Sequence, residues 1–172
     1  MKGIQKKVEV ASNIAIILVA FLLGGVLIYR FVLSDPPKTV AVQNKKIENG
    51  TKFDLPNANW NKSEKTLVMA LSTNCRYCSE STPFYQKLVE QKAENENVRL
   101  VVVTPQDLEQ TKDYLAKHKL SVDEIKQSTL NKIKVGGTPT LILVDKNGAV
   151  VESWVGKLPP EKEAEVINRL FG

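Results

Sequence analysis

Cysteine and histidine are scarce in this 172-residue sequence, which has two cysteines and one histidine. Both cysteines lie in one short segment, Cys75-Arg76-Tyr77-Cys78, so no further disulfide can staple the fold. Zinc needs about four ligands, and His118 is the only histidine that could join the pair. The cysteine pair is therefore either a redox device or half of a metal site, and the ligand count disfavours the metal. No metal or other cofactor is expected.

Long basic runs, internal repeats and low-complexity tracts are also missing. The 24 Lys and Arg residues exceed the 19 Asp and Glu residues by five, but no run of Lys and Arg is longer than two. A nucleic-acid-binding chain would concentrate this charge on one face or helix. The dispersed charge indicates a solvated surface, and nucleic acid is not an expected partner. The length allows one domain and an accessory segment.

The accessory segment is a long apolar run, Ile14–Leu33. Twenty residues of helix span about 30 Å, the thickness of a bilayer's hydrocarbon core. A cleaved signal peptide is the alternative, but the unbroken apolar part Ile14–Tyr29 is longer than the usual signal core and no A-x-A-like site follows. Lys2, Lys6 and Lys7 favour a cytoplasmic N-terminus. We expect a retained signal anchor that binds membrane lipid.

The rest of the chain divides around this transmembrane anchor. Residues 1–13 form a short cytoplasmic N-terminus, residues 34–44 a linker that contains Pro36-Pro37, and residues 45–172 the folded domain. With the N-terminus inside, the domain lies on the extracytoplasmic, periplasmic side of the cytoplasmic membrane. Disulfides form and persist there, which favours redox activity for the cysteine pair.

Apolar runs and helical periodicity predict an α/β fold for the domain, with a central mixed sheet flanked by helices. Strands are expected at Thr39–Gln43, Thr66–Ser72, Val98–Val103, Thr140–Val144 and Ala149–Trp154, with a hairpin turn at residues 145–148. Helices are expected at Cys75–Glu94, Asp107–His118, Asp123–Lys132 and Pro160–Phe171. The cysteine pair directly follows a buried strand and opens a helix.

A cysteine at a helix N-terminus meets unpaired N–H groups and the positive end of the helix dipole, which favour the thiolate. Cys75, the first and more exposed cysteine, is the expected nucleophile, and Cys78 the resolving thiol. The positive charge of Arg76 favours the Cys75 thiolate in the same direction. Tyr77, between the two cysteines, is a candidate docking residue for a substrate.

The segment Gly136-Gly137-Thr138-Pro139-Thr140 places a Thr-Pro bond directly before a strand, a plausible cis-proline site. A strand, a C-x-x-C helix, and a Thr-Pro before a hairpin and a last helix together resemble the thioredoxin superfamily. Pro83 matches the helix-kinking proline of that superfamily. The resemblance implies that Thr138 and Pro139 lie beside the redox-active disulfide Cys75–Cys78 and pair with the backbone of a substrate.

Within the superfamily, the chain is most similar to the membrane-anchored TlpA/ResA-like thiol–disulfide oxidoreductases. Cys78 and Pro139 are 61 residues apart, and this length fits the helical insert of that branch. The resemblance implies a protein thiol–disulfide oxidoreductase that acts on exported proteins, as a reductant rather than an oxidant. Cytochrome c maturation is one such role, with electrons supplied by a membrane or extracytoplasmic thiol protein.

Three positions depart from the family pattern: Asn74 stands where most relatives have tryptophan, Met69 where thioredoxin has a buried acid, and Ser81 where ResA-like proteins tend to have glutamate. A glutamate, Glu80, lies one position before Ser81. Two other functions stay open at this point. A thiol peroxidase is conceivable because Ser72 lies three residues before Cys75, although Val68 replaces the proline of peroxiredoxins. The domain could also be a binding module that keeps the fold without catalysis.

Overall fold

A computed structural model of the chain describes residue 14, residues 17–25 and residues 46–172. Residues 17–25 are helical. Within the described part of the chain, no helix is both long enough and apolar enough to cross a membrane. The other residues of the expected anchor Ile14–Leu33 lie outside the described residues, as do residues 1–13, the linker 34–44 and the strand expected at Thr39–Gln43.

Five strands form the sheet of the folded domain, in the order β3-β2-β1-β4-β5. Their bounds are β1 Lys65–Ala70, β2 Val98–Thr104, β3 Glu124–Gln127, β4 Thr140–Asp145 and β5 Val150–Val155. β2 is parallel to β1 and to β3, whereas β4 is antiparallel to β1 and to β5. The predicted mixed sheet is confirmed.

The central strand β1 is buried on both of its faces. Alternate side chains of a strand point to opposite faces, and they enter two separate core clusters here. Leu67 and Met69 belong to one cluster, Val68 and Ala70 to the other, and none of the four is more than 1% exposed. Such two-sided burial explains why this strand is a continuous apolar run in the sequence.

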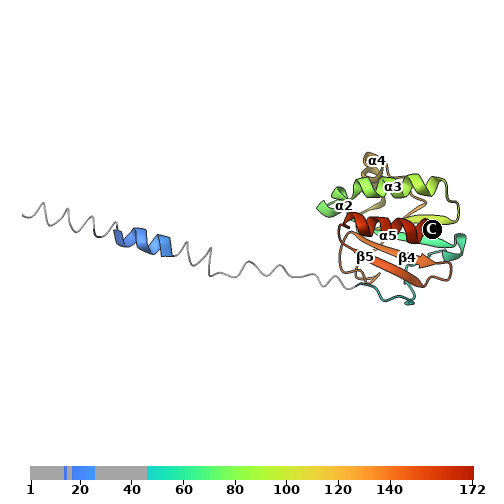
Figure 1. Ribbon diagram of the computed structural model, residues 1–172, viewed down its shortest axis with the longest axis horizontal. Helices are drawn as coiled ribbons and strands as arrows, with labels where there is room; N and C mark the ends of the chain where they lie inside the picture. The colour runs from blue at the N-terminus through green and yellow to red at the C-terminus, as the bar shows by residue number, and fades with distance from the viewer. Residues whose placement is uncertain (1–13, 15–16, 26–45) are drawn as a thin grey trace, which may run out of the picture. The chain divides into compact units, whose positions relative to one another are not determined.

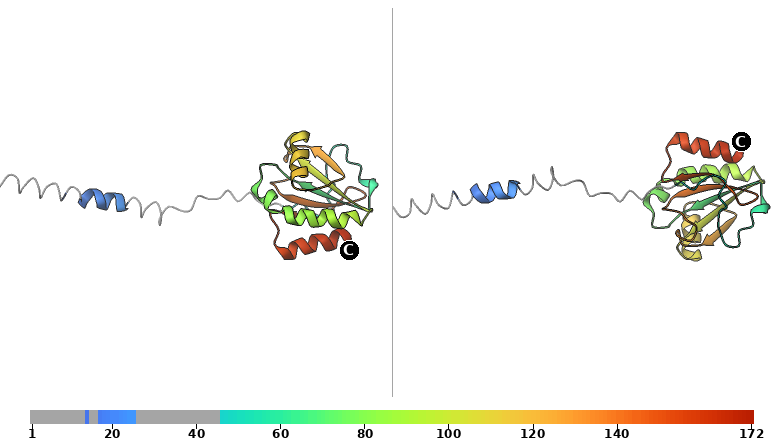
Figure 2. Two further views of the ribbon diagram at one scale, coloured as in Figure 1. Left: turned by 90° about the horizontal axis from the view of Figure 1, so that it is seen from above. Right: turned by 90° about the horizontal axis from the view of Figure 1, so that it is seen from below.

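Helices cover the first of these faces. Their bounds are α2 Arg76–Glu80, α3 Thr82–Ala93, α4 Leu108–Lys117 and α5 Pro160–Phe171. Side chains of α3, α4 and α5 share one core cluster with the sheet, and α3 and α5 lie side by side (Figures 1 and 2). The opposite face is closed by the short 3-10 turn η2 (Trp60–Lys62) and by irregular segments that contribute Phe53, Leu55, Ile133 and Val135.

The helix expected at Cys75–Glu94 is divided into α2 and α3 at Ser81. Pro83, at the start of α3, has no N–H to donate to the preceding turn, and its ring disfavours a continuous helix. Ser81 fills the break: its N–H bonds to the carbonyls of Tyr77 and Cys78, and its hydroxyl donates to the Tyr77 carbonyl at 2.8 Å. The cysteines therefore lie on a short helix of their own.

The prediction of a helix at Asp123–Lys132 is wrong. Its first part is the edge strand β3, which pairs in parallel with β2, and turns follow. Asp123 exchanges two hydrogen bonds with the backbone of Leu100, one through its side chain and one through its own N–H. Arg99 also bonds to Glu124 at 2.7 Å. These contacts with β2 override the weak local preference of a polar segment.

The strand register brings the cysteine pair and the Thr-Pro segment together. Ala70 at the end of β1 is paired with Thr140 at the start of β4. Because the two strands are antiparallel, the segment that leaves β1 and the segment that enters β4 lie at the same end of these strands. Cys75 follows β1 by five residues, and Pro139 directly precedes β4.

Candidate redox site

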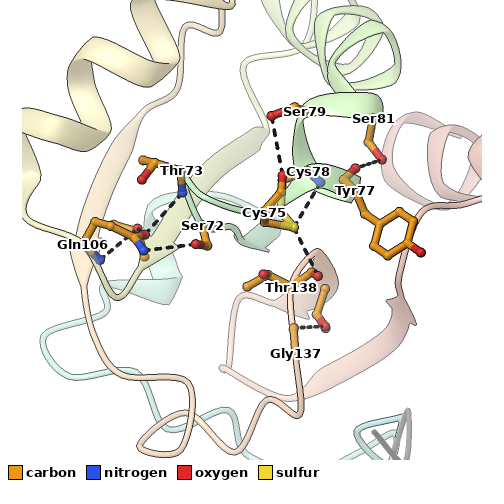
Figure 3. Close-up of a disulfide and its surroundings, with 12 residues drawn as sticks. Ser72, Thr73, Cys75, Tyr77, Cys78, Ser79, Ser81, Gln106, Gly137 and Thr138 are labelled. Atoms are coloured by element: carbon orange, nitrogen blue, oxygen red, sulfur yellow. Dashed lines mark hydrogen bonds between the residues drawn. A yellow bond between two sulfur atoms is a disulfide. The ribbon is translucent and has the colours of Figure 1, made fainter. Parts of the chain in front are cut away.

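A disulfide joins Cys75 and Cys78, whose Cα atoms are 5.2 Å apart (Figure 3). Cys75 is the N-cap of α2, and its sulfur accepts a hydrogen bond from the Cys78 N–H at 3.1 Å. Hydrogen bonds to a charged acceptor are the strong ones, so this bond favours a thiolate on Cys75 when the disulfide is open. Cys75 is partly exposed and Cys78 is fully buried. A partner therefore reaches Cys75 first.

The Thr138–Pro139 peptide is cis, as the sequence predicts. The Thr138 carbonyl oxygen lies 3.3 Å from the Cys75 sulfur, so a thiol at this position would donate its proton to that carbonyl. Two hydrogen bonds hold the surrounding backbone. Thr140 Oγ1 donates to the Gly137 carbonyl, and the Gly156 N–H donates to the Pro139 carbonyl, both at 2.8 Å. Thr138 stays partly exposed beside the reactive sulfur.

Arg76 and Tyr77 are both on the surface of α2. Tyr77 is 57% exposed, which leaves its ring available to a partner. The Arg76 side chain is 86% exposed and donates to Glu80 at 2.7 Å. Glu80 also accepts from Lys157, in the loop after β5, at 2.9 Å. The charge of Arg76 is therefore partly offset by the carboxylate of Glu80.

Both cations act on the Glu80 carboxyl. The hydrogen bond from Lys157, and then the one from Arg76, hold the pKa of Glu80 below its usual value, although burial acts in the opposite direction. In return, the hydrogen bond and charge of Glu80 raise the pKa of Arg76. At neutral pH this cluster is one anion between two cations, and one of the cations, Arg76, directly follows Cys75 in the chain.

The atypical positions of the sequence are occupied by side chains without a titrating carboxyl. Met69 is 1% exposed and belongs to the core cluster beneath the helices. Ser81 is buried and bonded to α2, as described above. Asn74 is exposed next to Cys75.

Gln106 is a polar neighbour of the site that the sequence does not indicate. It follows β2, yet its side chain bonds to Ser72 and Thr73 in the loop before Cys75 (Figure 3). Gln106 and Ser72 are 34 positions apart in the sequence, so no local sequence pattern indicates their contact. Only a correct pairing of β1 with β2 could have suggested it.

Nothing among the described residues groups three or more His, Cys, Asp or Glu side chains that could hold a metal ion. His118 ends α4, where its ring packs on Tyr114 with centroids 4.5 Å apart. Its Nδ1 lies 3.4 Å from the Thr82 hydroxyl. The groups that the structure brings together at the site are two sulfurs, the Thr138 carbonyl and the hydrogen bonds around them.

A family model described as Redoxin matches residues 37–170. No curated protein matches the chain. Several solved structures share its fold. The thioredoxin domain of a thiol–disulfide oxidoreductase from Bacteroides vulgatus is 18% identical, covers 72% of this chain and 97% of its own, and has a TM-score of 0.55. A thiol:disulfide interchange protein from a Bacteroides species is 20% identical over 74% and 89% of the two chains, with a TM-score of 0.54.

StoA from Bacillus subtilis is 21% identical over 61% of this chain and 83% of its own, with a TM-score of 0.50. At such identities the likeness shows the thioredoxin fold alone. The Redoxin model, by contrast, covers most of the chain and includes both cysteines and the cis-proline. The chain therefore belongs to the Redoxin family of the thioredoxin superfamily, and its Cys75–Cys78 pair is that of a thiol–disulfide oxidoreductase.

Proposed function

We propose that this protein reduces disulfides of other proteins outside the cytoplasm while an N-terminal helix tethers it to the membrane. The observation that carries the exchange chemistry is the asymmetry of the disulfide. Cys75 is accessible and lies 3.3 Å from the Thr138 carbonyl, whereas Cys78 is fully buried behind it. One sulfur can meet a partner and the other can only react within the molecule.

The exchange proceeds in two balanced steps from the dithiol form. The Cys75 thiolate attacks one sulfur of a partner disulfide, an S–S bond forms between the proteins, and the second partner sulfur leaves as a thiolate that takes up a proton. The Cys78 thiolate then attacks the Cys75 sulfur and releases the first partner sulfur. The partner gains two electrons and two protons, and the Cys75–Cys78 disulfide remains. An external dithiol must reduce it again.

Thr138, Pro139 and Tyr77 form the partner side of the site in this proposal. The partly exposed Thr138 offers backbone groups to an extended partner segment, since main-chain pairing of this kind gives affinity without demanding one sequence. The buried Pro139 holds the loop. Tyr77 presents an amphipathic ring next to the sulfurs, and such rings contribute strongly to protein interfaces.

The membrane tether and the reducing direction rest on different grounds. The apolar run Ile14–Leu33 and the lysines before it support an anchor with a cytoplasmic N-terminus. The resemblance to TlpA/ResA-like proteins supports reduction of exported thiols, for instance those of apocytochromes. A membrane-bound thiol protein would supply the electrons.

Insulin reduction by the full chain in detergent, with dithiothreitol as electron source, tests the exchange. We expect turnover that is abolished in Cys75→Ser. Equal rates for this variant and the wild type would refute catalysis and leave a binding module. The reduction potential of the pair, measured against glutathione, tests the direction. A potential as high as that of strong protein oxidants, about −120 mV, would overturn the reductant role.

The two native cysteines can also report the orientation in the membrane. In intact cells treated with a permeant reductant, a membrane-impermeant maleimide should label Cys75 if the domain lies outside. The double variant Cys75→Ser, Cys78→Ser is the control for background labelling. Labelling that occurs only after the cells are lysed would contradict the extracytoplasmic placement.

A further inference from the structure

The loop between β1 and the redox pair, Ser72 to Asn74, is held from outside by one side chain. Gln106 Nε2 donates to the Ser72 hydroxyl at 3.0 Å, and Gln106 Oε1 accepts from the Thr73 N–H at 3.3 Å. The same oxygen accepts from the Thr104 hydroxyl at 2.8 Å. Figure 3 shows Gln106 on the opposite side of this loop from Thr138.

The orientation of the Gln106 amide follows from its partners. A backbone N–H can only donate, so the side-chain atom that faces the Thr73 N–H must be the oxygen. The nitrogen then faces the Ser72 hydroxyl, which accepts. The Thr104 hydroxyl, which donates to the side-chain oxygen, also accepts from the backbone N–H of Gln106 at 3.3 Å. The amide thus bonds at both ends and ties the loop to the end of β2.

Gln106 also directly precedes Asp107, the N-cap of α4. The far end of α4 contacts α3, the helix that follows the short cysteine helix α2. There the His118 carbonyl accepts a hydrogen bond from Gln86 Nε2 of α3 at 2.9 Å. The segment after β2 is therefore bonded to the cysteine loop through Gln106 and, away from that loop, to α3 through His118.

We propose that Gln106 is a positioning residue of the redox reaction: by fixing the Ser72–Thr73 loop to the start of α4, it sets the Cys75 sulfur against the Thr138 loop, where a protein disulfide must dock. This inference rests on the proposed function. Cys75 begins α2 immediately after this loop, and its own N–H bonds to the Ser72 carbonyl at 3.1 Å. A shift of Ser72 is therefore passed directly to the nucleophile.

A role of Gln106 in positioning Cys75 predicts different losses of rate for two kinds of substrate. A protein disulfide must bind along the Thr138 loop and meet the sulfur in one geometry, and small misplacements of reacting atoms cost large factors in rate. A small aromatic disulfide, such as dithiobis-nitrobenzoate, reaches Cys75 freely and does not use that loop. Gln106→Met removes all the side-chain hydrogen bonds with little change of volume.

We expect Gln106→Met to reduce insulin roughly tenfold more slowly, with less than about a twofold change in the rate with the small disulfide. Gln86→Met is the matched control, because it removes the hydrogen bond at the other end of α4 and spares the cysteine loop. It should keep both rates near those of the wild type. Gln106→Glu should restore most of the insulin rate, because a carboxylate accepts from the Thr73 N–H and the Ser72 hydroxyl can rotate to donate.

Equal insulin rates for Gln106→Met and the wild type would overturn the inference, as would equal losses with both substrates or in Gln86→Met. If Gln106→Met does not fold, Ser72→Ala, which removes one bond of the set, should still lower the insulin rate selectively, and an unselective effect would overturn the inference. A wild-type chain that reduces no insulin contradicts the proposed function instead.

Discussion

At the scale of single residues, the charge next to the nucleophile is set by Glu80 as well as by Arg76. Glu80 accepts from Arg76 on its own helix and from Lys157 in the loop after β5. That loop also bonds to the cis-proline segment through the Gly156 N–H. Glu80 thus reduces the positive potential at Cys75 and links two of the segments that surround the sulfur.

We expect Glu80→Gln to lower the pKa of the Cys75 thiol and to make the pair more oxidising. Without the carboxylate, Arg76 and Lys157 act on the thiolate uncompensated, and stabilising the thiolate stabilises the reduced form. Because Arg76 and Lys157 are exposed and Glu80 is partly exposed, the effect should be small and should shrink with added salt. Thiolate absorbance as a function of pH measures it.

The double variant Glu80→Gln, Arg76→Gln is the control for this effect. It removes one anion and one cation next to Cys75, so its thiol should titrate closer to that of the wild type than the thiol of Glu80→Gln does. A pKa of Cys75 that does not change in Glu80→Gln at low salt would contradict the argument.

At the scale of elements, the turn between β4 and β5 is organised by a carboxylate. Asp145 Oδ1 accepts from the N–H groups of Asn147 and Ala149 at 2.9 and 2.8 Å. The bond from Ala149 is the main cause that holds the pKa of Asp145 below its usual value. The Asp-Lys-Asn-Gly hairpin expected from the sequence is therefore confirmed, together with the reason for its aspartate.

This lowered pKa predicts how the stability of the fold depends on pH. In the unfolded chain the aspartate has a pKa of about 4, which is above its pKa in the folded protein. The stabilisation by Asp145 is therefore complete above about pH 4 and is lost as the pH falls through the pKa of the folded state. Asp145→Asn keeps an oxygen acceptor but cannot titrate. Urea midpoints should therefore fall less between about pH 6 and about pH 3 in Asp145→Asn than in the wild type. Parallel curves would contradict this prediction.

The glycine of the same turn meets two separate constraints. Gly148 has φ of +80°, and a Cβ built there would lie 2.6 Å from the Trp60 ring. Gly50 has a similar φ of +82° but no heavy atom within 4 Å of such a Cβ. The pair separates the backbone term from the contact with Trp60.

Gly50→Ala should cost about 1 kcal/mol of unfolding free energy for the left-handed backbone alone. Gly148→Ala should cost about 1–3 kcal/mol more, because Trp60 must move as well. Urea unfolding of the two variants gives the difference directly. Equal losses in the two variants would show that the Trp60 ring yields without cost.

At the scale of the whole molecule, the sequence predicts those parts whose signals are local. The strands β1, β2 and β4 are apolar runs because both of their faces are covered. The Thr-Pro sequence directly before a strand predicts the cis-proline loop that lies beside Cys75. β3 was missed because it is a polar edge strand held by its pairing with β2, and such pairing leaves little trace in a four-residue segment.

The same limit applies to the side chains around the redox pair. Gln106 and Lys157 reach it from elements that are distant along the chain, and the fold has to be known before either can be assigned. The break at Ser81 lies between these cases. Pro83 indicates a kink, but the sequence does not reveal that the Ser81 hydroxyl and N–H would close the end of α2.

The difference in exposure between Cys75 and Cys78 leads to a prediction for the whole protein and its partners. In Cys78→Ser, the exposed Cys75 can still form a mixed disulfide, but no second thiol resolves it. In Cys75→Ser, the remaining Cys78 has no exposed surface and should not reach a partner. Cells that express the full-length Cys78→Ser chain should therefore accumulate covalent adducts that dithiothreitol releases, and Cys75→Ser should yield roughly tenfold fewer. Comparable amounts of adduct from both variants would show that Cys78 becomes exposed to partners. Such a result would contradict the assignment of Cys75 as the cysteine that reacts first.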